Sequence, residues 1–232
     1  MNILPEIEKF VTSLDEVTLG FSTGRDSLCC AQVLRELKVK FTPFYFYQIP
    51  DMKFIERSIK MYEDYFETKI IQLPHPMLAD YFRHQDFQPP KMINYMARFS
   101  FPKLTFERLI SFYFKQTRGE DPKLYDVNGM RSAESFNRRK LFERHGYINH
   151  VKRKISLIGN WKKADIMNYI DKNNLPQTDD YKIWNRSFDG MKYQFLFGVK
   201  ENYPDDWQTI LEYFPLTELE LKRYEFNRQY WA

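Results

Sequence analysis

The sequence predicts an α/β protein: a five-stranded parallel sheet with helices on both faces, followed by a helical, aromatic-rich C-terminal extension. In the first third of the chain, short β-prone segments alternate with segments of helical periodicity, which is typical of β-α-β units with right-handed crossovers. Further along, a polar turn that contains glycine again follows a predicted strand. Turns of this kind lie at the carboxyl edge of a parallel sheet, where ligands bind.

The order of the elements follows from periodicity. Apolar residues spaced three or four apart indicate helices, whereas continuous apolar or aromatic runs indicate buried strands. The first part contains a helix at residues 5–14, a strand at 17–21, a helix at 28–37, a strand at 41–47, a helix at 52–66 and a strand at 68–73. The second part contains a helix at 101–116, strands at 123–128 and 155–158, a helix from 160 to 173, and tail helices at 204–213 and 217–228. We therefore expect a body at residues 1–180 and an extension at 181–232 packed on it.

Composition places the chain among globular proteins of one-domain size. Of its 232 residues 43% are hydrophobic and 28% are charged, and the net charge of +4 is compatible with anionic ligands without implying nucleic acid. No apolar run is long enough to span a bilayer and no secretory signal is visible, so we expect a cytoplasmic protein that does not bind membranes. The two cysteines, Cys29 and Cys30, are adjacent, which predicts no disulfide and a reducing compartment.

The first candidate site is the loop after the first strand, with the sequence Ser22-Thr23-Gly24-Arg25-Asp26-Ser27. A strand, loop and helix in this order direct backbone N–H groups and the positive end of the helix dipole at one point, which suits an anion. Gly24 allows a positive φ and close approach of a ligand. Hydroxyl donors come from Ser22, Thr23 and Ser27, and Arg25 adds a charge that suits phosphate. Asp26 fits beside an anion if Mg²⁺ lies between them. An ordinary N-capped helix is the alternative.

A second turn of the same kind follows the predicted strand at residues 123–128. Gly129 turns the chain, Arg131 projects from the turn, and Arg138 and Arg139 follow one to two helical turns later. Guanidinium groups at the carboxyl end of a strand suit a second anionic group. From residue 131 to 154, eight basic residues stand against two acidic ones, so a solvated basic helix is the alternative.

The motifs together resemble a known family. The first loop resembles the S-x-G-x-D-S pyrophosphate loop of the N-type ATP pyrophosphatases. With the later G-x-R-x-x-E-S-x-x-R at residues 129–138, and the W-x-x-x-D-I-x-x-Y-I and L-P stretches at 161–176, it is similar to the phosphoadenosine phosphosulfate (PAPS) reductase family. The resemblance implies an adenine nucleotide alpha hydrolase-like fold with an adenine nucleotide, ATP or PAPS, at the carboxyl edge of the sheet.

The departures from the family pattern bear on function. Reductases of this family carry a nucleophilic cysteine near the C-terminus, and this chain has no cysteine after Cys30, nor a second cysteine pair for an iron–sulfur cluster. Cys29 and Cys30 are expected to be core residues of a helix. Sulfonucleotide reduction is therefore disfavoured. In the loop, Arg25 replaces the usual lysine and Thr23 a glycine, which changes the geometry offered to phosphate.

The leading hypothesis is a Mg²⁺-dependent ATP pyrophosphatase. Ser22 to Ser27 would hold the β- and γ-phosphates with Asp26 on the metal, and Arg131 and Arg138 would neutralise charge near the α-phosphate or an acceptor anion. The acceptor would become adenylylated, and by analogy with phage and mobile-element relatives it would belong to nucleic-acid or sulfur modification. The rivals are a nucleotide- or partner-binding module without turnover and a relative of the reductases that binds PAPS without a thiol.

Other side chains are weaker candidates. Asp126 at the end of its strand either approaches the site or caps the strand, and His75 is expected to be structural. An aromatic stretch forms either a lid or base-stacking surface, or a second hydrophobic cluster; its members are Trp184, Phe188, Tyr193, Phe195 and Phe197. The tail aromatics predict packing onto the body or an oligomer contact; they are Trp207, Tyr213, Phe214, Tyr224, Phe226, Tyr230 and Trp231.

Overall fold

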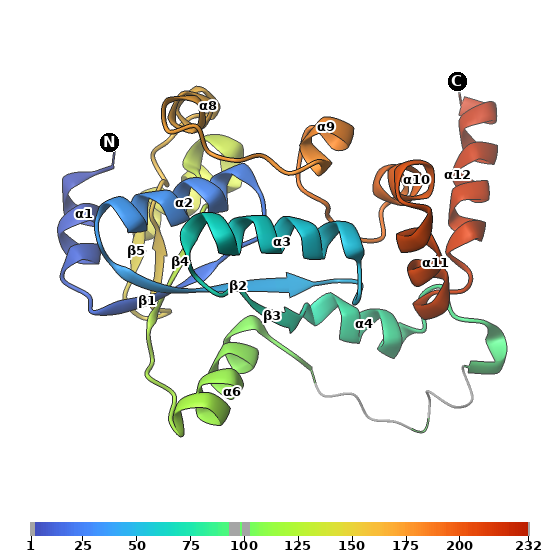
Figure 1. Ribbon diagram of the computed structural model, residues 1–232, viewed down its shortest axis with the longest axis horizontal. Coiled ribbons are helices and arrows are strands. Elements are labelled where there is room, and N and C mark those ends of the chain that lie inside the picture. Colours follow the sequence, from blue (N-terminus) through green and yellow to red (C-terminus); the bar gives the residue numbers. More distant parts are fainter. Residues whose placement is uncertain (1–2, 93–97, 99–102, 232) are drawn as a thin grey trace. The chain divides into compact units, whose positions relative to one another are not determined.

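The computed structural model describes residues 3–92, 98 and 103–231 (Figure 1). The chain divides into two compact units. The first unit comprises Met1–Tyr45, Met61–Gln72 and Pro122–Thr178, and the second comprises Phe46–Lys60, Leu73–Asp121 and Asp179–Ala232. The division of the sequence into a body at residues 1–180 and an extension at 181–232 stays a prediction.

A six-stranded sheet has the strand order β3-β2-β1-β4-β6-β5. The strands are β1 (Glu16–Gly20), β2 (Lys40–Tyr47), β3 (Ile71–Pro74), β4 (Tyr125–Asn128), β5 (Ile148–Asn149) and β6 (Lys154–Ser156). Strand β1 pairs in parallel with β2 and with β4, and β4 pairs in parallel with β6. The predicted α/β class, with a mostly parallel sheet and flanking helices, is confirmed.

The strand count differs from the prediction of five parallel strands. Residues 148–149 form a short sixth strand, β5, which runs antiparallel to β6. Only four residues separate the two strands, and a connection that short can join antiparallel neighbours but not parallel ones. A two-residue strand is too brief to show an alternating pattern, and for this reason periodicity did not reveal it.

Helices fill the intervals between the strands and form the C-terminal part of the chain. They are α1 (Pro5–Thr12), α2 (Arg25–Glu36), α3 (Lys53–Phe66), α4 (Pro76–His84), α6 (Phe106–Arg118), the 3₁₀ turn η1 (Ser132–Glu134), α7 (Phe136–His145), α8 (Lys163–Lys172), α9 (Asp180–Trp184), α10 (Tyr193–Asn202), α11 (Pro204–Tyr213) and α12 (Thr217–Trp231). The predicted tail helices correspond to α11 and α12, whereas α10 was not predicted. The predicted helix at 101–116 begins within residues that lie outside the described part. No helix of the described chain is long and apolar enough to cross a membrane.

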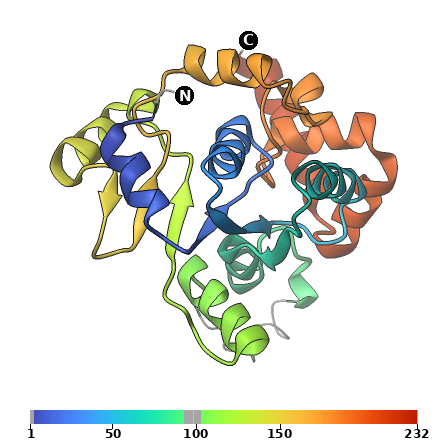
Figure 2. The same ribbon diagram turned by 60° about the vertical axis from the view of Figure 1, so that its left-hand side comes forward.

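The core of the first unit is formed where α2 packs on the sheet. Leu19 of β1, Val127 of β4 and Ile155 of β6 are fully buried, as are Leu28 and Leu34 of α2. Helix α2 contacts β1, β4 and α8, and Figure 2 shows it lying beside the yellow-green strand β4. This packing fixes where α2 begins, and therefore where the loop before it lies.

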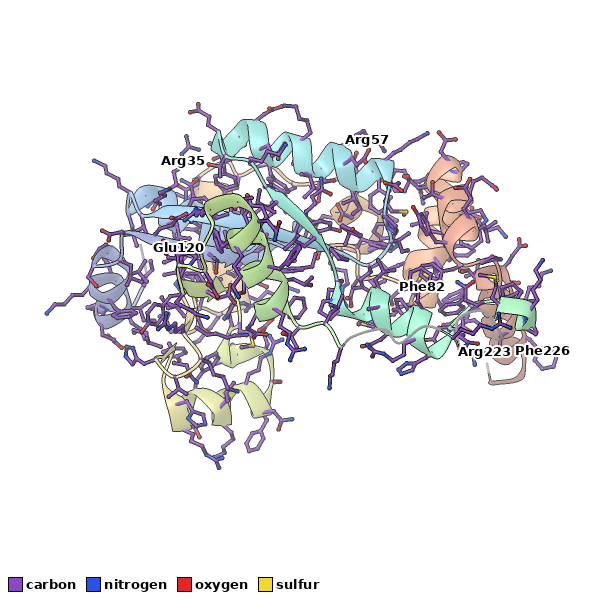
Figure 3. All side chains as sticks on the ribbon, turned by 90° about the horizontal axis from the view of Figure 1, so that it is seen from below. Arg35, Arg57, Phe82, Glu120, Arg223 and Phe226 are labelled. Carbon is purple, nitrogen blue, oxygen red and sulfur yellow. The ribbon has the colours of Figure 1, made fainter. Side chains whose placement is uncertain are left out.

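The second unit has an aromatic core. Phe54 of α3 stacks on Tyr203 and contacts Trp184 and Phe188, and Phe195 is fully buried against the last two. Trp184, Phe188 and Phe195 therefore belong to a hydrophobic cluster, the second of the two predicted alternatives, whereas Phe197 is exposed and stacks on Tyr193. Farther along the tail, Phe214 is buried and stacks on Phe82 of α4, which is labelled in Figure 3, while Trp207 is also buried. The side chains of Tyr230 and Trp231 lie outside the described part.

Candidate functional site

The two predicted motifs follow the two central strands of the first unit. The loop at residues 22–27 comes directly after β1, and the turn at 129–131 comes directly after β4. These strands are parallel neighbours, so both turns lie at the same edge of the sheet. From β1 the chain continues to β2 on one side, and from β4 it reaches β6 on the other side. This reversal of direction is the topological switch point at which open α/β sheets bind ligands.

The first loop places the N-terminus of a helix at this edge. Gly24 is the N-cap of α2 and, lacking a side chain, supplies no capping oxygen. The first N–H groups of a helix have no partner within the helix, so those of the first turn of α2 are suited to hold an anion. The arrangement matches the strand, loop and helix predicted from the sequence.

The left-handed residue of the loop is Thr23 rather than Gly24. Thr23 has a φ of 60°, whereas Gly24 is extended with a φ of −77°. A β-branched residue is strained at positive φ, and such strain is typical of functional loops. The Thr23 hydroxyl donates a hydrogen bond to the Ser22 carbonyl oxygen at 2.6 Å, which offsets part of this cost. Gly24, which allows a positive φ, does not adopt one, and the chain reverses one residue earlier, at Thr23.

Ser27 closes the loop on itself. Its buried hydroxyl donates to the Gly24 carbonyl oxygen at 2.8 Å and accepts from the Ser22 backbone N–H at 3.2 Å. The Ser22 hydroxyl lies 3.3 Å from the Ser27 hydroxyl. Because the Ser27 proton is engaged within the loop, this residue holds the loop in shape.

Arg25 is oriented by a residue that sequence reasoning missed. Its Nε donates to the Gln177 side-chain oxygen at 2.9 Å. Gln177 directly follows Leu175 and Pro176, the L-P pair that contributes to the family resemblance. Its position directly after the L-P pair was the only feature of the sequence that could have indicated a role for Gln177.

Asp26 and Arg131, which are 105 residues apart in the sequence, form an ion pair. The Arg131 Nε lies 2.7 Å from one carboxylate oxygen of Asp26, and its Nη2 lies 3.4 Å from the other. The Arg131 side chain is only 11% exposed, whereas that of Asp26 is 34% exposed. The structure thus joins the two motifs through these two side chains. The sequence had assigned a metal ion to Asp26 and an anion to Arg131.

Gly129 permits this contact through its lack of a side chain. A Cβ at this position would lie 2.8 Å from the Asp26 Cβ and 3.0 Å from the Asp26 carbonyl carbon. The backbone of Gly129 does not adopt a positive φ, so the left-handed conformation is not what requires glycine here. The close approach of the two loops therefore requires a glycine at this position.

Glu134 gathers the arginines of the second motif. Its carboxylate accepts a hydrogen bond from the Arg131 backbone N–H at 2.9 Å and lies 3.7 Å from the Arg131 Nη2. It also forms an ion pair with Arg138, whose backbone N–H is capped by the Ser135 hydroxyl at 3.2 Å. Arg139, by contrast, is exposed. Of the two candidates on α7, Arg138 is therefore the one that is tied to Arg131.

The cysteines have the character of core residues. Cys29 and Cys30 are both buried in α2, and the Cys30 Sγ lies 3.6 Å from the Asn128 carbonyl oxygen. Burial raises the pKa of the Cys29 thiol to about 12, with a further contribution from the Asp26 carboxylate, and burial also raises that of Cys30. Both thiols are neutral at physiological pH, and a neutral, buried thiol is a poor nucleophile.

We expect neither thiol to react with Ellman's reagent at pH 8 in the folded protein, and both to react after denaturation. A variant with Cys29→Ala and Cys30→Ala should keep every nucleotide-dependent activity of the parent. Rapid labelling of the folded protein, or thioredoxin-coupled sulfite release that disappears in the double variant, would instead identify a reductase.

The remaining candidates have structural partners. The Asp126 carboxylate accepts a hydrogen bond from the Thr18 hydroxyl at 3.2 Å between β4 and β1, which ties the two strands together. His75 is the N-cap of α4, where its Nδ1 accepts from the Met77 backbone N–H at 3.0 Å. Within the described ranges, no three His, Cys, Asp or Glu residues are grouped so as to hold a metal ion. A metal at this edge would therefore depend on Asp26 and on oxygen atoms of a ligand.

No family model matches the sequence, and no curated protein matches it. Solved structures do match, at low identity. The chain is similar to an NH3-dependent NAD synthetase from Campylobacter jejuni, at 13% identity over 95% of this chain and 93% of that one with a TM-score of 0.45. It is also similar to a PAPS reductase from Candida auris, at 12% identity over 79% of this chain and 89% of that one with a TM-score of 0.46. A third similar structure is an NMN synthetase from Francisella tularensis, at 11% identity over 87% of this chain and 93% of that one with a TM-score of 0.41.

Proteins that share a fold at such identities differ widely in activity. The residues of the site, and not the fold, therefore bear on the function of this chain.

Proposed function

We propose that this chain binds ATP with Mg²⁺ at the edge formed by residues 22–27 and 129–138, and that it adenylylates an acceptor with release of pyrophosphate. The contact between Asp26 and Arg131 carries the proposal. It unites a loop suited to phosphate with an arginine-bearing turn at the switch point of the sheet.

The first loop would hold the β- and γ-phosphates. N–H groups at the start of α2 supply hydrogen-bond donors, and Arg25, held by Gln177, supplies positive charge. Because these donors are already oriented, they need little reorganisation when the nucleotide binds. This favours binding of the phosphates and stabilises the charge that develops on them during the reaction.

The donor set fits Mg²⁺ through a single carboxylate. An ionised carboxylate offers about four lone-pair positions, of which Arg131 engages two, so Asp26 can still contribute an oxygen ligand. Mg²⁺ takes one or two carboxylates and completes its shell with phosphate oxygens and water. When bound, the ion would neutralise charge on the pyrophosphate.

The reaction is a displacement at the α-phosphorus. An oxygen or nitrogen of the acceptor forms a bond to that phosphorus, and the bond to the oxygen bridging the α- and β-phosphates breaks. Pyrophosphate leaves with the electron pair, and the proton of the acceptor passes to solvent. Arg131 and Arg138 would stabilise the charge that develops on the phosphate oxygens, since both are drawn to this edge by Glu134.

Two assays test the proposal. Isothermal titration with ATP, PAPS and AMP, each with and without Mg²⁺, determines which nucleotide binds. A pyrophosphate-release assay with ATP then detects turnover. Tight ATP binding without pyrophosphate release from any acceptor would identify a binding module, and preference for PAPS would identify a thiol-independent relative of the reductases. Absence of binding by all three nucleotides would contradict the proposal.

Replacement of Asp26 by asparagine is expected to remove the dependence of ATP binding on Mg²⁺. The amide keeps the size of the side chain and can still accept from Arg131, but a neutral oxygen is a much poorer magnesium ligand. We expect Mg²⁺ to strengthen ATP binding about tenfold or more in the parent and by less than about twofold in the variant, a difference of about 1 kcal/mol or more.

The matched control is Asp171→Asn, which neutralises an exposed carboxylate on α8. It should retain the full response to Mg²⁺. An unchanged response in Asp26→Asn would place the metal, if one binds, on other oxygen atoms.

A further inference from the structure

The positive charge of the chain is concentrated in one segment. The chain has 35 basic and 31 acidic residues, and residues 131–154 hold eight of the basic and two of the acidic ones. Subtracting these leaves 27 basic against 29 acidic residues in the rest of the chain. The net positive charge therefore comes entirely from this segment, which comprises η1, α7 and the β5–β6 hairpin.

Helix α7 exposes most of its surface. Of its ten residues only Phe142 is buried. Phe136 at its first position is 66% exposed, a large fraction for a phenylalanine outside an interface. The cationic end of Lys140 lies 5.5 Å from the centre of the Phe136 ring. An aromatic face and a cation thus lie together on the solvent side of the helix.

Two cations of α7 have no carboxylate partner. Within the part of the chain that the structure describes, Arg139 and Arg144 make no ion pair, while Arg138 and Lys140 pair with Glu134 and Glu143. Phe136, Lys140 and Arg144 are spaced by four residues and so follow one face of α7.

We propose that α7 binds single-stranded nucleic acid, with Lys140 and Arg144 at backbone phosphates and Phe136 stacked on a base. Positively charged surfaces that carry exposed aromatic rings are typical of single-strand binding, because every base has a face for stacking. Neither Asp26 nor Arg131 takes part, so this surface is additional to the nucleotide site.

A membrane surface fits the same residues less well. A helix that lies in a membrane interface needs a continuous apolar face. The two exposed apolar residues of α7, Phe136 and Leu141, are five positions apart and thus about 140° apart around the helix. Duplex DNA would engage the cations but would leave the Phe136 ring without a base to stack on.

The test measures binding of fluorescently labelled single-stranded RNA and DNA of about 15 nucleotides, and of the matching duplex, by anisotropy without ATP or Mg²⁺. We expect single strands to bind more tightly than the duplex, and Phe136→Ala to weaken single-strand binding about fivefold or more while leaving duplex binding unchanged. The two strands, measured side by side, show whether the ribose 2′-hydroxyl contributes.

A pair of charge-matched variants separates this surface from net charge. Lys140→Glu with Arg144→Glu alters α7, and Lys163→Glu with Lys172→Glu makes the same change of charge on exposed positions of α8. Each contacted phosphate contributes about −0.7 to the slope of log affinity against log salt. We expect the α7 variant to reduce the magnitude of this slope by about 1.4, and the α8 variant to leave it nearly unchanged.

Equal losses in the two double variants would overturn the proposal, since binding would then follow net charge. Preference for the duplex with no effect of Phe136→Ala would also overturn it, and so would binding to vesicles of anionic phospholipid with no binding to single strands. Because ATP is absent, these outcomes are independent of the proposed adenylylation. A thermal melt of each variant checks that it is folded.

Discussion

Arg131→Ala is expected to weaken ATP binding by about tenfold to a hundredfold. Loss of a charge-assisted hydrogen bond costs about 1.5–3 kcal/mol, which corresponds to this range of affinity. The substitution also leaves the Asp26 carboxylate without its neutralising partner beside the proposed phosphate site. Isothermal titration with ATP and Mg²⁺ measures the effect directly.

Two further variants define what Arg131 contributes. Arg144→Ala removes an exposed arginine of the same basic segment, which belongs to the proposed nucleic-acid surface and not to the nucleotide site, so ATP affinity should be retained. Arg131→Lys keeps the charge but cannot reproduce the two-pronged contact with Asp26, and an intermediate affinity is expected. If Arg131→Ala and Arg144→Ala bind ATP equally well, the second motif is only a basic helix.

The Asp26–Arg131 pair can be examined further by a double-mutant cycle. If both side chains act on one nucleotide complex, the effects of Asp26→Asn and Arg131→Ala on ATP affinity will not add, and the coupling should lie in the range of about 0.5–3 kcal/mol found for residues in contact. Additive effects would indicate that the two side chains act separately once the nucleotide is bound.

Gly129→Ala is expected to lower both stability and ATP affinity. The added methyl group would lie 2.8 Å from the Asp26 Cβ and 3.0 Å from a backbone carbon, and the backbone cannot easily move away because α2 is packed on the sheet. Overpacking of this kind costs about 1–3 kcal/mol. For a protein of this size, each kcal/mol lowers the melting temperature by roughly 2–4 °C. Differential scanning fluorimetry and ATP titration measure the two effects.

The control for this substitution is Gly20→Ala at the end of β1. A Cβ there would meet only the Val127 carbonyl oxygen at 3.9 Å, an ordinary contact. This variant should melt close to the parent and bind ATP normally. A Gly129→Ala protein that melts and binds like Gly20→Ala would show that the two loops can separate at little cost.

The sequence by itself determined the parts of this protein that local pattern controls. Residues 17–21 and 41–47 read as buried strands, and the structure has β1 and β2 there. Glycine, hydroxyl and charged residues between a strand and a helix located the first loop, and the same pattern located the second. Because the carboxyl ends of parallel strands share an edge, the predicted parallel sheet placed both motifs at the same edge.

Only the tertiary structure decided which side chains meet at that edge. The pairing of Asp26 with Arg131 spans 105 residues, and nothing in either motif indicates that one binds the other. Gln177 reaches Arg25 across 152 residues, and Gly129 is required by the Cβ and backbone of Asp26, a contact that no local pattern encodes. The sequence did not reveal the left-handed Thr23 either, because a β-branched residue disfavours positive φ, whereas Gly24, which tolerates it, is extended. Periodicity reports which face of an element is buried, whereas distances between loops depend on how the buried faces finally pack.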